Sequence, residues 1–332
     1  MNYNKIVQGI LDIGEAMLQS GAENFRLEDS FYRMCRSYGF KRSDVFVIPS
    51  NIQVTVETPE GEIITQIRHI ESSEPNFDQL DYLNNLCRYV CQHTPDENEM
   101  REKYLEVINR EPQKRITRYA AGIMGGTGFA VFFGCNLRDA VIAFIVSVMI
   151  VAVGDWLAKR ESNLLVYNGI LAFISEVIII GALKMGIAEH PDRIMIGIVM
   201  LLISGLSTTN GIRDLLQRDF ISGFINIMNS FLGAAGIAFG IGLAIILFHE
   251  GYSDHFILNH SVPIQLLSCT VACTGFALWF KIRGKQVWYN SIGAFFTWAI
   301  YVAVYAVKPS NFMATMIAAG LLDLCIYHVQ SK

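Results

Sequence analysis

The chain has 332 residues, of which 52% are hydrophobic and 17% are charged, and its mean hydropathy is +0.36. This composition excludes an ordinary soluble globular protein of the same length and indicates a membrane protein. The formal net charge of -4 gives no reason to expect a nucleic-acid partner.

Charged residues are concentrated in the first third of the chain, whereas the remaining two thirds contain one apolar run after another. We therefore expect a soluble part followed by a membrane part. The seven cysteines form no CxxC motif and no paired cluster of ligands, so no metal site is predicted. No local motif signals a Ser/His/Asp or Cys/His catalytic arrangement, so the sequence does not predict an enzyme.

The first 115 residues are predicted to form an α+β domain. Apolar residues at helical spacing predict four helices, over residues 3–19, 25–38, 76–92 and 96–109. Between the second and third helices, residues 43–70 are rich in Val, Ile and Thr, alternate in polarity, and contain turn residues at 49–51 and 59–61. This pattern predicts three strands joined by two turns.

The membrane part is predicted to contain about eight spanning helices, because a span needs about 20 mainly apolar residues. The expected spans are residues 116–134, 137–157, 164–185, 193–207, 220–248, 262–280, 287–307 and 312–327. We divide this part into a first membrane module over residues 116–250, with about five spans, and a partial second module over residues 251–332, with about three spans.

The distribution of Lys and Arg among the connections predicts on which side of the membrane the chain ends lie. If the first 115 residues are cytoplasmic, the inner connections carry basic residues: Lys159, Arg160, Arg213, Arg218, Lys281, Arg283 and Lys285. The longest outer connection, residues 249–261, contains no Lys or Arg. Because basic residues favour the cytoplasmic side, we expect both ends of the chain in the cytoplasm.

Glycine-rich faces occur in the first and fifth expected spans. They consist of Gly122, Gly125, Gly126 and Gly128, and of Gly233, Gly236, Gly240 and Gly242. Small residues at such spacing allow helices to approach closely, so these faces predict helix packing. A phosphate-binding loop at Gly125–Gly128 is disfavoured, since no predicted strand precedes it and no Lys-Ser/Thr pair follows.

Glu176 lies near the middle of the third expected span. A carboxylate at membrane depth costs about 2.5 kcal/mol or more on insertion scales, so it is expected to face a cavity or a partner. Two interpretations stand: Glu176 binds a proton, or it is a neutral, hydrogen-bonded residue that fixes helix packing. Asp155, near a helix end, is expected to pair with Lys159 four residues later.

Residues 204–229 place several polar side chains between two long apolar runs. Before Gly211 the hydroxyl and amide side chains are Ser207, Thr208, Thr209 and Asn210. This combination predicts a helix break, and broken helices in membranes present free backbone groups to a solute. Arg213 would then bind a carboxylate, and Asp214 or Asp219 an ammonium group or a proton. The alternative is a cytoplasmic turn with capping residues and an Arg–Asp pair.

Three stretches carry a family resemblance. The first, Leu18–Asp29, includes Ser20, Gly21, Glu23, Arg26, Glu28 and Asp29. The second, Thr209–Leu216, is followed by Asp219 and by Ser222–Gly223. The third and weaker one is Thr274–Phe280 with Gly293, Trp298 and Tyr301. Together they resemble the threonine/serine exporter family of bacterial membrane proteins.

The resemblance implies a multi-pass protein of the bacterial inner membrane, with a cytoplasmic N-terminal domain and two membrane modules. It implies proton-coupled export of threonine and serine, so the proton gradient takes the place of a cofactor. Because related two-component members are linked to dicarboxylate export, a succinate-type exporter is one alternative. A non-transporting scaffold or subunit is another. The expected partners are a small-molecule substrate, membrane lipids, and a second copy or a partner subunit.

The resemblance and the residue pattern together give the expected site. Substrate and ion binding are expected at Thr209, Asn210, Arg213, Asp214, Asp219 and Glu176. From the N-terminal motif, Glu23, Arg26, Glu28 and Asp29 are expected to contact the inner face of the transport path. The alternative for this motif is a capped second helix in which Arg26 pairs with its acidic neighbours.

The sequence departs from the family pattern in three places. Leu202–Gly205 stands where the family usually has Val-Pro-Gly, so a proline-made helix break is missing. Asn226 and Asn229 stand where the family often has an Arg and a Glu. The sequence also ends at Lys332, before the Pro-rich motif of the second module, so we expect a truncated second module or a partner that completes the path.

Overall fold

The computed structural model describes residues 2–71, 73–161, 163–248, 261–307 and 309–330, and side chains as far as residue 321. Most of these residues are helical, and the chain forms two compact units. The first unit is Met1–Gln113 with Ser204–Phe231, and the second is Lys114–Ile203 with Leu232–Lys332. Nearly all of the expected connection at 249–261 lies outside the described residues. The division into one domain and two membrane modules stays a prediction.

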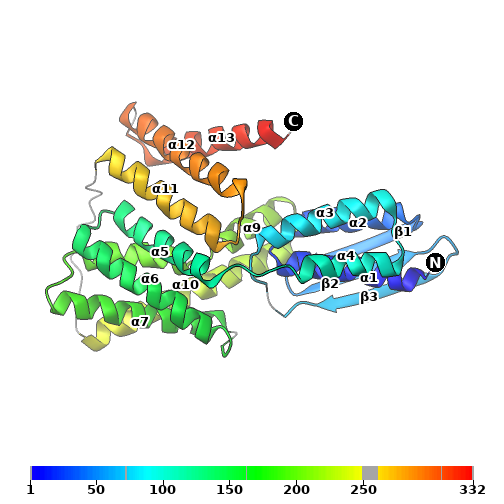
Figure 1. Cartoon of the computed structure of the whole chain (residues 1–332), viewed down its shortest axis with the longest axis horizontal. Helices are drawn as coiled ribbons and strands as arrows, with labels where there is room; N and C mark the ends of the chain where they lie inside the picture. Colours follow the sequence, from blue (N-terminus) through cyan, green and yellow to red (C-terminus); the bar gives the residue numbers. More distant parts are fainter. Residues whose placement is uncertain (1, 72, 162, 249–260, 308, 331–332) are drawn as a thin grey trace. The chain divides into compact units, whose positions relative to one another are not determined.

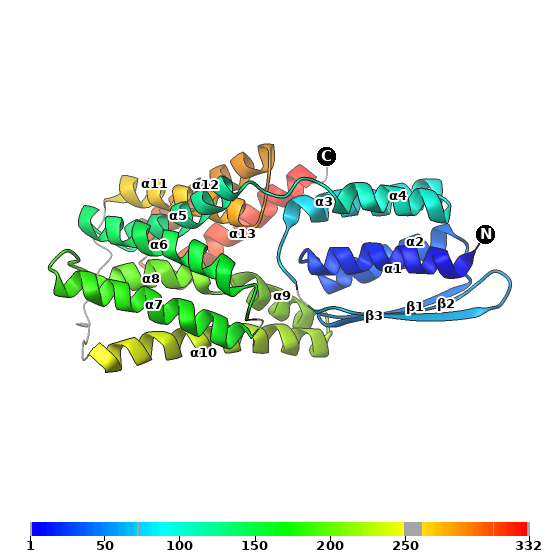
Figure 2. The same ribbon diagram turned by 60° about the horizontal axis from the view of Figure 1, so that its bottom comes forward.

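The N-terminal part of the first unit is an α+β fold (Figure 1). Its elements are α1 (Tyr3–Gln19), α2 (Asn24–Ser37), β1 (Arg42–Ile48), β2 (Asn51–Glu57), β3 (Ile63–His69), α3 (Phe77–His93) and α4 (Glu97–Ile108). The strands form an antiparallel sheet in the order β1-β2-β3. Figure 2 shows α1 and α2 between this sheet and the layer of α3 and α4. The predicted helices and strands of this region are confirmed.

Alternating polarity in β2 explains why only one face of the sheet is covered. Ile52, Val54 and Val56 are buried in the same core as residues of α1 and α2, whereas Gln53 is exposed on the other face. Successive side chains of a strand point to opposite faces, so a period of two buries one face only. The core of this region is therefore formed between the sheet and its covering helices.

The first unit also contains α9 (Gly205–Leu216) and the beginning of α10 (Phe220–Phe248). The helix break predicted before Gly211 is wrong, because Thr209 and Gly211 lie inside α9. The hydroxyls do not interrupt this helix: that of Thr209 donates to the carbonyl oxygen of Gly205, four residues earlier, at 3.0 Å. The chain instead leaves its helical path at Ile203, which is extended.

The second unit consists of long helices. They are α5 (Arg115–Phe132), α6 (Leu137–Leu157), α7 (Leu164–Lys184), α8 (Pro191–Leu202), the later part of α10, α11 (Val262–Trp279), α12 (Lys285–Val307) and α13 (Asn311–Gln330). Helix α5 packs against α6, α8 and α11. The fourth expected span corresponds to α8 and the start of α9, and each of the other expected spans corresponds to one helix.

Five helices in the described residues, α6, α7, α10, α11 and α12, are long and apolar enough to cross a membrane. The count rises to six if the bent pair α8 and α9 forms one broken span. The chain is therefore a mostly helical protein with five or six candidate spans. The expectation of eight spans and of a cytoplasmic N-terminal domain stays a prediction.

Glycines place helix backbones of the second unit in direct contact, as their spacing predicts. A Cβ atom added at Gly240 would lie 2.2 Å from the carbonyl oxygen of Gly169, and one at Gly236 would lie 2.3 Å from that of Leu165. We call this contact between α7 and α10 the glycine seam. Gly122 and Gly128 of α5 are similarly close to Val151 and Ala272, whereas Gly242 faces open space.

Asp155 does not follow the expected pairing with Lys159. Its carboxylate lies 2.9 Å from the Arg118 guanidinium of α5, which packs alongside α6. An ion pair between helices replaces the local pair because Arg118 extends from a neighbouring helix toward the same carboxylate. Both side chains are about one-third exposed, so the pair stabilises the fold by about 1 kcal/mol or less.

Candidate functional site

In the first unit, two segments that are about 190 residues apart in the chain meet side chain to side chain. The Asn24 amide donates to the Asp214 carboxylate at 3.2 Å, and the Arg213 guanidinium forms an ion pair with Glu23. Glu23 and Asn24 stand at the start of α2, and Arg213 and Asp214 stand near the end of α9. The two sequence motifs therefore form one cluster, which we call the Arg213–Asp214 site.

Asp214 is buried, with 3% of its surface exposed. Its Oδ2 atom accepts hydrogen bonds from the amides of Asn24 at 3.2 Å and Asn226 at 3.0 Å. Asn226 belongs to α10, which packs so closely on α9 that a Cβ atom at Gly211 would lie 2.8 Å from Ile227. A buried carboxylate is stable only when it is hydrogen-bonded, and here both donors are neutral side chains.

Arg213 remains accessible, because 44% of its side chain is exposed. Its partner Glu23 is shared, since the second carboxylate oxygen of Glu23 lies 3.3 Å from the Arg26 guanidinium. Glu23 therefore makes both the expected local pair with Arg26 and the ion pair with Arg213 of α9. Glu23 makes no side-chain hydrogen bond that caps α2.

Val47, in β1, connects the N-terminal motif to the start of α10. Its N–H donates to Glu28 at 3.3 Å, and its carbonyl oxygen accepts a hydrogen bond from the buried Ser222 hydroxyl, also at 3.3 Å. Burial raises the pKa of the Glu28 carboxyl above its ordinary value, the Val47 donor opposes that shift, and the negative charges of Asp219 and Asp214 add to it. Glu28 therefore lies close to further negative charge.

Other predicted residues have structural partners instead. Asp219 accepts a hydrogen bond from the Ser222 N–H at 3.3 Å at the start of α10, and Asp29 pairs with Arg33 at 2.8 Å. Ser20 ends α1, and Gly21 has a φ of +90°, which favours glycine, beside Pro75. Thr209 is exposed and Asn210 is partly buried on α9.

Glu176 lies in the second unit, inside α7, with 1% of its surface exposed. It lines a small cavity of about 10 Å³, room for about one water molecule. The other lining residues are almost all apolar: Ala172, Ser175, Ile179, Met195, Ile198, Val199, Leu202 and Ile241. Glu176 thus faces a cavity, as expected for a carboxylate at this depth.

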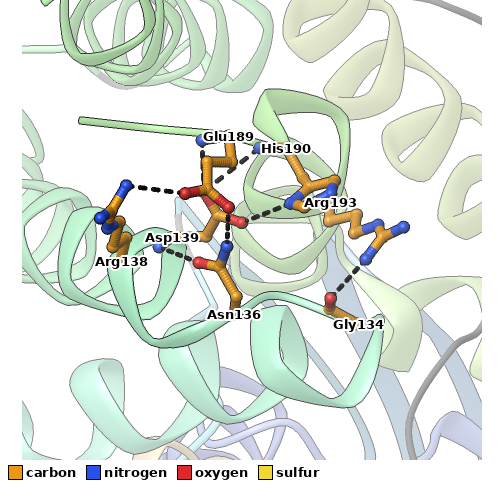
Figure 3. Close-up of polar contacts among 7 residues, drawn as sticks. All are labelled: Gly134, Asn136, Arg138, Asp139, Glu189, His190 and Arg193. Carbon is orange, nitrogen blue, oxygen red and sulfur yellow. Dashed lines mark hydrogen bonds and ion pairs between the residues drawn. The ribbon is translucent and has the colours of Figure 1, made fainter. Parts of the chain in front are cut away.

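A second polar cluster, in the second unit, was not singled out from the sequence (Figure 3). The fully buried Asp139 of α6 accepts hydrogen bonds from the backbone N–H groups of Glu189 at 2.8 Å and His190 at 3.2 Å. Its other oxygen lies 2.9 Å from His190 Nδ1. We call this the Asp139 network. It joins the start of α6 to the turn between α7 and α8.

Further contacts surround the Asp139 network (Figure 3). The Glu189 carboxylate accepts from Arg138 at 2.8 Å and from Asn136 at 2.5 Å, and Arg193 donates to the Gly134 carbonyl at 2.6 Å. The sequence contains one local sign of this arrangement, because Asn136 precedes Asp139 by three residues, a spacing typical of an N-cap. Nothing local indicates the partner turn.

The two clusters differ in what they offer a ligand. The Arg213–Asp214 site combines an accessible cation with a carboxylate one residue away, and its partners come from another segment of the chain. Neither cluster forms a metal site, since the described residues contain no group of three or more His, Cys, Asp or Glu side chains suited to a metal ion. Opposite charges at neighbouring positions suit a zwitterionic solute.

Comparisons with known proteins indicate the family of the chain. The family model for threonine/serine exporters (ThrE) matches residues 8–248, which include both segments of the Arg213–Asp214 site. A protein named threonine/serine exporter, from Corynebacterium glutamicum, is 24% identical over 245 residues. That match covers 71% of this chain and 50% of the relative, so the chain spans about half the length of the relative. No solved structure matches the chain.

Proposed function

The chain belongs to the threonine/serine exporter family, and on that premise we propose that it exports small amino acids of the threonine and serine class, which it recognises at Arg213 and Asp214. Membership of this family, with the apolar helices, supports a multi-pass membrane protein, and a transporter family implies a non-enzymatic function. The observation that carries the proposal is the pairing of an accessible guanidinium with a neighbouring carboxylate.

An amino acid presents a carboxylate and an ammonium group a few ångströms apart. The Arg213 guanidinium would bind the carboxylate through charge-assisted hydrogen bonds, and Asp214 would accept from the ammonium group. Asn226 would hold the Asp214 carboxylate in place through its 3.0 Å hydrogen bond. A dicarboxylate would place a second negative charge against Asp214, so this arrangement favours amino acids over succinate-type solutes.

Export against a gradient needs an energy source, and we assign this role to the proton gradient. Glu176 is the proposed proton carrier, because it is buried in a small, largely apolar cavity. A carboxyl group there exchanges one proton more readily than it tolerates a permanent charge. The charge distribution among the connections supports a cytoplasmic first unit in a bacterial inner membrane.

Efflux from liposomes tests the site. The purified chain should release labelled threonine in a manner that depends on a pH gradient. Arg213→Ala should reduce threonine binding about 10- to 100-fold, the effect of losing hydrogen bonds to a charged group. Arg42→Ala is the matched control, because Arg42 lies on β1 and pairs with Asp44. Unchanged binding in Arg213→Ala, or competition by succinate without competition by threonine, would contradict the proposal.

Glu176→Gln tests the coupling separately. The amide has nearly the same shape but takes up no proton in the physiological range, so we expect downhill threonine efflux to continue while its dependence on the pH gradient disappears. Efflux measured with and without a pH gradient gives this readout. If gradient dependence persists in Glu176→Gln, another group carries the proton.

A further inference from the structure

We propose that Glu23 and Asn24 act as an internal substitute for the solute and occupy the Arg213–Asp214 site when no amino acid is bound. The inference rests on the proposed function of that site and adds a means of regulating it. In this view, the N-terminal motif closes the site, and a bound amino acid displaces it.

Glu23 and Asn24 offer the same two groups as an amino acid: a carboxylate for Arg213 and an N–H donor for Asp214. The Glu23 carboxylate takes the position of the solute carboxylate on Arg213, and the Asn24 amide donates to Asp214 at 3.2 Å as an ammonium group would. Both pairs are consecutive in sequence, so one short segment contacts both parts of the site. An amino acid and this segment therefore compete for the same atoms.

The Asn24 amide is a weaker ligand for Asp214 than a solute would be. It is neutral, whereas an ammonium group carries a full positive charge and adds Coulomb attraction to its hydrogen bond with the carboxylate. The Glu23–Arg213 pair is partly exposed, with 25% and 44% of the side chains accessible, so water and salt weaken it. The internal ligand is thus strong enough to occupy the site and weak enough to leave it.

Glu23 also has a second partner when it leaves Arg213. Its other carboxylate oxygen is 3.3 Å from the Arg26 guanidinium, three residues along α2. An ion pair at this spacing on one helix remains when the contact to α9 is lost. After displacement, Glu23 therefore keeps Arg26 as its counter-charge, and the solute carboxylate gains Arg213.

Threonine binding to the full chain in lipid nanodiscs tests the inference. Glu23→Gln weakens the internal ligand, so we expect threonine to bind about two- to five-fold more tightly, the range that removal of a partly exposed ion pair allows. Glu23→Asp, which keeps the charge but shortens the side chain, should shift affinity in the same direction. Glu97→Gln is the matched control, since Glu97 is 27% exposed and pairs with Lys5 within the same unit.

The outcomes separate this inference from the proposed function. If wild-type protein binds threonine and Arg213→Ala does not, while both Glu23 variants bind no more tightly than Glu97→Gln, the internal-ligand inference fails and the site stands. If Arg213→Ala binds threonine normally, the proposed function itself fails. Tighter binding in both Glu23 variants, with unchanged affinity in Glu97→Gln, supports displacement.

Discussion

Asp139 and Asp214 are both buried helix aspartates, but different kinds of donor hold them. Two of the groups that contact Asp139 are backbone N–H groups of one turn, at 2.8 and 3.2 Å, and the third is the ring of His190. The donors to Asp214 are the side-chain amides of Asn24 and Asn226. Backbone donors move only if the turn itself moves, whereas side-chain donors leave by a rotation.

Under the proposed function, this difference separates a structural carboxylate, Asp139, from a ligand-binding one, Asp214. The Asp139 network fixes the turn between α7 and α8 to the start of α6 mainly through two backbone donors. At the Arg213–Asp214 site, the charged groups of α9 are held by side chains of a distant segment that an amino acid would replace. The type of donor, more than burial, is what distinguishes the two sites.

The largest expected effect comes from removing each carboxylate. Asp139→Ala leaves two backbone N–H groups and a ring nitrogen without their buried acceptor, and should lower the free energy of unfolding by about 3 kcal/mol. Asp214→Ala should cost about 1 kcal/mol, because the released amides re-orient and nearby negative charges are relieved. Thermal unfolding of both variants in the same detergent measures the difference. Equal losses of stability in the two variants would contradict the distinction between the two aspartates.

Hydrogen exchange in the presence of threonine sharpens the comparison further. Saturating threonine should increase deuterium uptake in peptides covering residues 20–30, since the N-terminal motif is displaced. Uptake at residues 185–193 should stay unchanged, because two backbone donors hold Asp139 and its network is not part of the proposed site. The expected increase is several-fold and reports local opening, not global unfolding. Lower uptake at residues 20–30 would mean that threonine stabilises the motif on the site.

The smallest expected effect concerns Glu28, beside the Arg213–Asp214 site. Burial raises its pKa in the folded protein, so the folded state retains a proton that the unfolded state has already released. Stability from this group is fully present below the ordinary pKa of Glu and is lost as pH rises through the raised folded pKa. Glu28→Gln should flatten this decline over the pH range that begins at the ordinary pKa of Glu, about 4. Thermal midpoints across that range give the readout, and identical profiles would exclude a role for Glu28.

Much of the fold is predictable from the pattern of hydrophobic residues. Polar contacts between distant segments are not predictable in this way. The sequence predicts the bounds of α1, α6 and α10 to the residue: α1 has a helical period of apolar residues, and α6 and α10 are long apolar runs. The polar residues before Gly211 predict a break that lies too late in the chain, because the Thr209 hydroxyl finds its acceptor within α9. The helical path still ends at Ile203, although the proline that the family usually has there is missing.

The site was partly predictable. The resemblance singled out both segments, but not their mutual contact, because no periodic signal links residues about 190 positions apart. Asn24 and Asn226 were not assigned roles at Asp214, since an amide on a helix is usually solvated. Asp155 shows the same limit, because the rule for residues four apart suggested Lys159 and the packing of α5 supplied Arg118.

The glycine seam between α7 and α10 also determines how those two helices are able to move. Backbone atoms lie directly against backbone atoms at Gly236 and Gly240, so no side chain there adjusts by changing its rotamer. Sliding α10 by one residue along α7 would bring Phe239 or Ile241 against the Gly169 carbonyl. Sliding it by a full turn would bring Leu232 to the place of Gly236. The two helices therefore have one register, and they either move together as one body or come apart.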